Sequence, residues 1–204
     1  MRPTHSSMHS WLACAGWLTL LACSSPAPAS SPAPAPPYSS AQTQAAAPAV
    51  AASPSVDSTG WLVVDSAGRS VTLDLKVTPA EGAPSARINS YRSGEARIVV
   101  PLGWTVKWNW RSTDSTTPHS LVVMVQREKI PLEGGRASLA NAMTRMVTEG
   151  LPAGQSDQTT FSADEAGWYW MLCGVPRHAL NGVWLELRVD PAATTASLQV
   201  KKKS

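Results

Sequence analysis

The stretch 168–184 constrains the fold most, because it places one thiol and one imidazole between two strand-like segments. It reads W-Y-W-M-L-C-G-V-P-R-H-A-L-N-G-V-W, with Cys173 five residues before His178. The aromatic run before Cys173 is typical of a buried strand, and the apolar/polar alternation over 184–189 is typical of a second strand. The sequence therefore predicts that both residues lie on one loop joining two strands.

The remaining thiols and imidazoles give this loop weight. The other two cysteines and two of the four histidines lie within residues 1–23, which have the pattern of an export signal. Downstream stand only Cys173, His178 and His119, the last just before the apolar segment 121–125. One thiolate and two imidazoles form the ligand set of mononuclear blue-copper sites, usually completed by a weak Met ligand. These three residues are therefore the candidate metal ligands.

Around these residues the sequence resembles the cupredoxin family, most closely its sulfocyanins and next its rusticyanins. The family pattern C-G-x-P-G-H-A-x-x-G-M-W is matched by C-G-V-P-R-H-A-L-N-G-V-W, and the resemblance covers about residues 61–189. It implies an all-β, Greek-key β-sandwich in which His119, Cys173 and His178 hold one copper ion. Ser120 stands where many members have Asn and rusticyanins have Ser, and we expect its hydroxyl to orient the ligand loop.

Two positions depart from the family pattern. Val183 occupies the place of the axial Met, so the resemblance implies a three-coordinate copper with a raised reduction potential, because loss of a thioether donor favours Cu(I). Met171, on the same strand face as Cys173, is open as a substitute ligand, and a decayed or repurposed site is also open. Arg177 replaces a Gly, and its charge either favours an anionic docking partner or is simply solvated.

Residues 1–22 have the pattern of a bacterial lipoprotein signal peptide. Arg2 supplies the positive start, residues 11–21 form an apolar segment too short to span a membrane, and L-L-A-C ending at Cys23 resembles a lipobox. The resemblance implies a lipid on Cys23 that anchors the protein to the outer membrane, with its domain in the periplasm or at the cell surface. An ordinary signal peptide cleaved elsewhere is the alternative.

The rest of the chain divides into a tether, one domain and a tail. Residues 23–58 begin with Cys23 and are otherwise nearly all Ala, Pro, Ser and Gln, which predicts a disordered tether. Residues 59–190 suffice for one core and are the expected cupredoxin domain. It carries a long insertion at 128–157, in which the helical spacing over 137–147 predicts a short helix. Residues 191–204, which end in three lysines before Ser204, are expected to be a flexible tail. Alternating short segments predict strands at 61–65, 71–77, 88–91, 96–100, 104–110, 121–125, 158–162, 168–171 and 184–189.

These features predict a one-electron carrier and not an enzyme. We expect a monomer whose copper cycles between Cu(II) and Cu(I), with redox proteins docking transiently near His178. A copper-binding or copper-delivery lipoprotein without electron transfer is the alternative, although such carriers favour Met-rich or His-rich motifs, and the four Met after Cys23 are scattered.

Other functional classes fit the sequence less well. A thiol enzyme needs an oxyanion hole and an orienting Asn or Asp, neither of which shows a diagnostic spacing. Zinc prefers a fourth strong donor where Val183 stands, and a dinuclear copper site needs a second Cys in the loop. The net charge of +3 is small and dispersed, so we expect no nucleic-acid partner.

Overall fold

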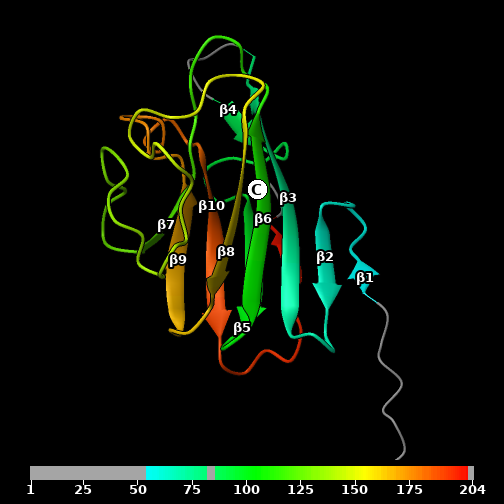
Figure 1. The fold of residues 1–204 in the computed structure, drawn as a ribbon. Coiled ribbons are helices and arrows are strands. Elements are labelled where there is room, and N and C mark those ends of the chain that lie inside the picture. Colours follow the sequence, from blue (N-terminus) through cyan, green and yellow to red (C-terminus); the bar gives the residue numbers. More distant parts are fainter. Residues whose placement is uncertain (1–53, 82–85, 202–204) are drawn as a thin grey trace, which may run out of the picture. The chain divides into compact units, whose positions relative to one another are not determined.

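The structure, a computed structural model, describes residues 54–81 and 86–201, and within these ranges it consists of two β-sheets without a helix (Figure 1). The all-β expectation is confirmed. The described part also offers no helix fit to cross a bilayer. The first sheet contains β1 (Ser55–Val56), β2 (Leu62–Asp65), β3 (Ser70–Pro79), β4 (Ala86–Ile88), β6 (Thr105–Ser112) and β8 (Ser156–Ser162). The second contains β5 (Ala96–Pro101), β7 (Val122–Val125), β9 (Gly167–Leu172), β10 (Trp184–Asp190) and β11 (Ser197–Val200).

Both sheets mix parallel and antiparallel strands. The first has the order β1-β2-β3-β6-β8, with β4 on β3, and its β3 and β6 are parallel. The second has the order β11-β5-β10-β9-β7, and its β5 and β10 are parallel. The chain passes from β3 to β6 through β5, which belongs to the second sheet. It passes from β5 to β10 through β6 and β8, which belong to the first sheet. These crossovers therefore connect the two layers.

One apolar core joins the sheets. Along β3, the residues Val71, Leu73, Leu75 and Val77 are buried and the residues between them are not, as expected for a strand with one face on a core. Inward side chains of the second sheet, such as Leu187, belong to the same cluster. Because this core packs against the inner faces of both sheets, it also fixes the end of β9 and the start of β10. These two points bound residues 173–183, here called the metal loop.

Two strands lie outside the expected domain of 59–190. β1 falls in the expected tether, and β11 falls in the expected tail, where it runs antiparallel to β5 from Ser197 opposite Val99 to Val200 opposite Ala96. The paired edge corrects the expectation of a flexible tail for residues 197–200. The expected signal peptide, Cys23, the tether up to residue 53 and residues 202–204 lie outside the described residues.

The insertion at 128–157 lies beside β7 and contains no helix, so the helix expected over 137–147 is wrong (Figure 1). Its backbone groups bond instead to the strand edge. Val123 N donates to Ala142 O at 2.9 Å, and Thr144 N donates to Leu121 O at 2.8 Å. These tertiary hydrogen bonds outweigh a weak helical spacing, and they cover an edge strand that would otherwise be exposed.

Candidate metal centre

The strand register brings the three candidate ligands to one end of the second sheet. Cys173 and His178 lie on the loop from β9 to β10, and His119 lies just before β7. Because β9 pairs with both β7 and β10, its last residue, Leu172, faces Val122 of β7 on one side and Trp184 of β10 on the other. Residues far apart in the chain are therefore adjacent in space.

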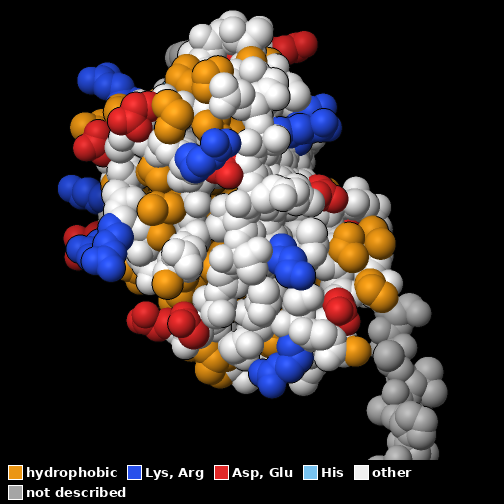
Figure 2. Space-filling model, viewed as in Figure 1, with side chains coloured by type: hydrophobic (Ala, Val, Ile, Leu, Met, Phe, Trp, Pro, Cys, Tyr) orange, Lys and Arg blue, Asp and Glu red, His pale blue; other side chains and the backbone are white. Residues whose placement is uncertain are grey.

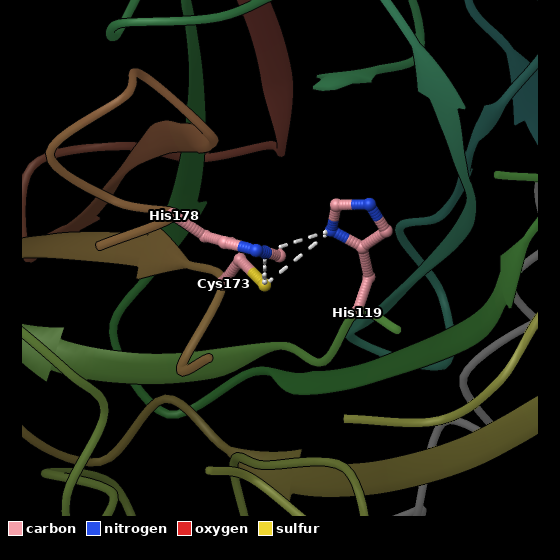
Figure 3. Close-up of side chains that lie close together, drawn as sticks. All are labelled: His119, Cys173 and His178. Carbon is pink, nitrogen blue, oxygen red and sulfur yellow. Dashed lines mark hydrogen bonds between the residues drawn. The ribbon is translucent and has the colours of Figure 1, made fainter. Parts of the chain in front are cut away.

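Figure 3 shows the thiol and the two rings turned toward one another. Cys173 Sγ lies 3.6 Å from His119 Nδ1 and 3.4 Å from His178 Nδ1, and the two nitrogens are 3.2 Å apart. Among the described residues, this is the one group of at least three His, Cys, Asp or Glu side chains whose ligand atoms lie this close. The three donor atoms surround a common point.

Burial sets the protonation of all three residues. It raises the pKa of the Cys173 thiol, which hydrogen bonds from Ser120 and Val175 partly offset. Burial lowers the pKa of His119 more than Asp114 raises it. The pKa of His178 is lowered by burial and then by the neighbouring His119. Neutral imidazoles, and a thiol whose proton a cation displaces, are the forms that bind a metal.

Ser120 links the two ligand loops to the insertion. Its Oγ accepts a hydrogen bond from Gly174 N at 2.9 Å and donates one to Val147 O at 2.6 Å. Its backbone N–H points at Cys173 Sγ, 3.4 Å away. The Ser120 hydroxyl thus joins the loop before β7, the loop after β9 and the insertion through hydrogen bonds.

Sequence reasoning missed Asp114, which lies in the polar loop between β6 and His119. Its side chain is buried, and its Oδ2 lies 3.0 Å from His119 Nε2. Thr116 donates to Oδ1 from N at 2.8 Å and from Oγ1 at 2.6 Å, while Thr117 Oγ1 donates to Oδ2 at 2.9 Å. Burial alone would raise the pKa of Asp114, but the hydrogen bonds from Thr116, His119 and Thr117 lower it below its usual range. The D-S-T-T run, a turn-forming pattern, is the only signal in the sequence.

The insertion forms one wall of the site. His119 N donates to Leu151 O at 3.1 Å, and Leu151 N donates to His119 O at 2.7 Å. Gly134 N donates to Gly174 O at 2.8 Å. A Cβ on Gly174 would lie 2.4 Å from Val147 Cγ1 and 2.7 Å from its carbonyl oxygen. Only glycine permits this approach between the insertion and the metal loop.

A cavity of about 570 Å³ adjoins His119 and His178, and Val183 is among its lining residues. Val183 is fixed by its backbone, since Cys173 N donates to its O at 2.9 Å and its N donates to His178 O at 3.0 Å. Met171 is fully buried in the main core and is not among the residues that line this cavity. Of these two candidates for the axial position, only Val183 lines the cavity, and its side chain is a hydrocarbon without a donor atom.

Arg177 also lines this cavity and has a left-handed backbone, with a φ of 70°. Glycine adopts that conformation without a steric penalty, whereas other residues are strained by it. The family pattern has glycine here, so the structure explains the pattern and identifies Arg177 as a strained replacement. Its positive charge lies immediately before the half-buried His178 in the loop.

Comparison with known proteins gives the family. The sequence model described as the sulfocyanin (SoxE) domain matches residues 57–199, most of the chain and all of the elements that build the site. The chain belongs to the sulfocyanin family. This confirms the resemblance stated on the metal loop.

Individual relatives of the family are distant. Sulfocyanin of Sulfolobus acidocaldarius is 27% identical over 129 residues, which are 60% of this chain and 64% of that relative. The match thus spans less than two thirds of the curated relative's length. Among solved structures, rusticyanin from Thiobacillus ferrooxidans is 20% identical over 60% of this chain and 83% of its own, with a TM-score of 0.42. Auracyanin from Roseiflexus castenholzii is 21% identical over 59% of this chain and 97% of its own, with a TM-score of 0.43.

The donor triangle fits a single copper ion, which relatives in the cupredoxin family bind. Bonds of about 2.0 Å to nitrogen and about 2.3 Å to sulfur, spread trigonally around one ion, place the donors roughly 3.5–3.7 Å apart. The observed separations of 3.2, 3.4 and 3.6 Å are close to this. His119, Cys173 and His178 therefore form a candidate copper site.

Proposed function

We propose that this protein is a blue (type 1) copper protein that carries single electrons outside the cytoplasm. The observation that supports the proposal most directly is the convergence of Cys173 Sγ and two Nδ1 atoms within 3.6 Å of one another, in a member of the sulfocyanin family. One thiolate with two imidazoles is the ligand set of copper electron-transfer sites.

The residues have separate tasks in this proposal. Bound copper supplies a Cu(II)/Cu(I) couple, and the chain keeps its surroundings fixed. Cys173 and His119 are buried and hold the ion away from water, while the half-buried His178 provides the edge through which an electron enters or leaves. Ser120 and the insertion hold the two loops in one geometry, so little rearrangement accompanies a change of charge.

We propose a raised reduction potential as a property of this site. Val183 lines the cavity next to both imidazoles and offers no donor atom. Without a thioether ligand, Cu(II) loses more stabilisation than Cu(I) does. The fully buried Met171 remains the alternative donor only if the strand that carries it moves.

We further propose that the protein is a monomer tied to the outer membrane by a lipid on Cys23, with its domain in the periplasm or at the cell surface. Its partners would be redox proteins that dock transiently near His178. On the face drawn in Figure 2, acidic and basic side chains are interspersed, so that face offers no single-sign patch for a nucleic acid.

Visible absorption tests the proposal. Cu(II) is added to the full-length protein in detergent, with Cys173→Ser as control. We expect an intense band in the orange-red that vanishes on reduction and is missing from the Cys173→Ser protein, because it arises from charge transfer between thiolate and copper. A colourless wild type with bound copper would reject the proposal.

Copper delivery is the second candidate function, and the same experiment separates the two. The tight, largely buried triangle favours electron transfer, since a delivery protein must release its ion to a partner. A protein that binds Cu(I) firmly and shows no Cu(II) charge-transfer band would favour delivery.

A further inference from the structure

One buried charge lies outside the candidate ligand set yet touches it. Asp114 is 4% exposed, and its Oδ2 lies 3.0 Å from Nε2 of His119, the ring nitrogen that faces away from Cys173. The other ring nitrogen, Nδ1, is the one in the donor triangle. A carboxylate of this kind only accepts hydrogen bonds. The proton of His119 must therefore reside on Nε2.

We infer that Asp114 is a positioning residue that holds His119 as the Nε2–H tautomer, ready to bind metal, and that its negative charge lowers the reduction potential of the site. The second half of this inference rests on the proposed copper function. Asp114 therefore opposes Val183: the hydrocarbon at the axial position favours Cu(I), and the carboxylate behind His119 favours Cu(II).

The surroundings of Asp114 keep it charged and fixed in place. Thr116 and Thr117 direct two backbone N–H groups and two hydroxyls at its carboxylate, at 2.6 to 3.3 Å. These donors lower its pKa below the usual range against the effect of burial. Such a cage costs little to desolvate once it is formed, because the fixed dipoles replace water. The carboxylate cannot rotate away from His119 without losing several of these bonds.

The charge balance gives the direction of the effect. Cu(II) with the Cys173 thiolate and the Asp114 carboxylate is neutral in total, and one electron from a reduced partner leaves the group at −1. Without the carboxylate, the same reduction goes from +1 to neutral. In a buried site, adding an electron beside a fixed negative charge is less favourable. A hydrogen bond to a carboxylate also makes the imidazole a stronger donor to the metal, which again favours Cu(II).

A purely structural role predicts something different. The cage around Asp114 is also a turn that shapes residues 113–118, so replacement would lower stability in either case. A structural role alone leaves the tautomer of His119 and the reduction potential where they were. These two quantities therefore decide the question.

The first experiment uses metal-free protein and needs no copper chemistry. Nitrogen-15 NMR of the imidazoles, at a pH where both are neutral, reports which ring nitrogen of His119 carries the proton. We expect almost only the Nε2–H form in the wild type and a mixture with the Nδ1–H form in Asp114→Ala, which removes the acceptor, whereas Asn would keep an oxygen that accepts from Nε2–H. Predominant Nδ1–H in the wild type, or an unchanged distribution in the variant, would overturn the positioning role.

The second experiment measures the reduction potential of copper-loaded Asp114→Asn. We expect the affinity for Cu(I) relative to that for Cu(II) to rise about tenfold, which raises the reduction potential of a one-electron couple by about 59 mV. Asp190→Asn is the matched control, because it removes the same charge at the far end of β10, about 20 Å along the strand from Trp184. An equal shift in both variants, or a fall in Asp114→Asn, would overturn the electrostatic role.

Thr116→Val keeps the test decisive if Asp114→Asn fails to fold. It removes the hydroxyl that donates to Asp114 Oδ1 at 2.6 Å, at nearly the same volume. Thr117 is less suitable, because its hydroxyl also lies 3.2 Å from His119 Nε2. More of the carboxylate charge then acts on His119, so we expect a twofold to threefold shift toward Cu(II), opposite in sign to that of Asp114→Asn. A shift toward Cu(I) would contradict the inference.

The two proposals fail separately. If copper gives no charge-transfer band, the electron-carrier function fails, and the NMR experiment still decides the role of Asp114 in the apoprotein. If the band is present while the tautomer and the potential are indifferent to Asp114, the inference fails and the electron-carrier function remains.

Discussion

The two candidate histidine ligands differ in how their rings are held, although the backbone N–H and C=O groups of each are hydrogen-bonded. His119 is 2% exposed, its ring bonds to Asp114, and its backbone is bridged in both directions to Leu151. His178 is half-buried, and its Nδ1 lies close to Cys173 Sγ and to His119 Nδ1. It follows a strained Arg177 and lies near the exposed Leu180 in the loop.

For the electron carrier proposed above, this difference would separate two tasks. An electron carrier needs a ligand cage that does not move and one ligand edge that a partner can approach. The His119 side supplies rigidity through buried hydrogen bonds, which cost energy to break because water cannot replace them. The His178 side supplies access, at the expense of local strain.

The largest effect is expected from removing each imidazole in turn. His119→Gly and His178→Gly both lose the charge-transfer band, because a donor is missing. Added imidazole should restore the band in His178→Gly, where the vacated space opens to solvent. It should not restore it in His119→Gly, whose place is buried behind Asp114. Visible spectra with increasing imidazole give the result.

Equal rescue of both glycine variants would contradict the asymmetry, because it would place the two ligands at equally accessible positions. Circular dichroism of both variants serves as the control for folding. Cys173→Ser with imidazole gives the baseline, since no added imidazole replaces the thiolate.

The next largest effect is expected where the rigid side meets the metal loop. Gly174→Ala should lower the free energy of unfolding of the apoprotein by about 2–3 kcal/mol, because the new methyl group meets Val147 Cγ1 and the Val147 carbonyl oxygen, and such overpacking cannot relax against backbone. Urea denaturation gives the value.

Gly154→Ala is the matched control for that change. Its φ is 78° and nothing lies within 4 Å of the added methyl, so only conformational strain of about 1 kcal/mol is expected. If the two glycine variants lose the same stability, the close contact between the insertion and the metal loop does not exist in solution.

The open side of the site was predictable from the sequence, and much of the fold with it. Alternation of apolar and polar residues, together with the aromatic run at 168–171, located nine strands to within a few residues. The Cys173 and His178 spacing on one loop is local in the chain, and one remaining His completed the set. Local patterns of this kind report on local structure.

His119 itself was predictable, but the contacts that hold it were not, because they are long-range. Asp114 lies in a loop, and only the pairing of β7 with β9 brings its neighbour His119 to Cys173. The insertion has a weak helical spacing that its hydrogen bonds to the β7 edge override. β11, near the C-terminal end of the chain, pairs with β5, and no local sequence pattern predicts this pairing.

A third prediction concerns Val183, which lies between the two sides. Val183→Met introduces a thioether at the cavity next to His119 and His178. We expect it to favour Cu(II) by about tenfold in relative affinity, a fall of about 59 mV in the reduction potential. Voltammetry gives the shift. Val125→Met, at an exposed position on β7, is the control and should leave the reduction potential unchanged. If the potential of Val183→Met is also unchanged, the added sulfur does not reach the ion.

The smallest effect is expected at Arg177, on the open side. Arg177→Gly relieves the left-handed backbone at φ 70°, but it also gives the unfolded chain more freedom, so the net gain in stability should be about 0.5 kcal/mol or less. The lost charge should matter more for approach to His178. Oxidation of the reduced protein by ferricyanide, an anion, should slow about twofold at low salt, and the difference should shrink as salt screens the charge. A cationic cobalt(III) complex should show the opposite change, because the same lost charge repelled it. If the rates with both oxidants change in the same direction, the variant alters the site itself, and the oxidants do not approach past Arg177. Opposite changes would identify the half-buried edge of His178 as the route by which electrons leave the site.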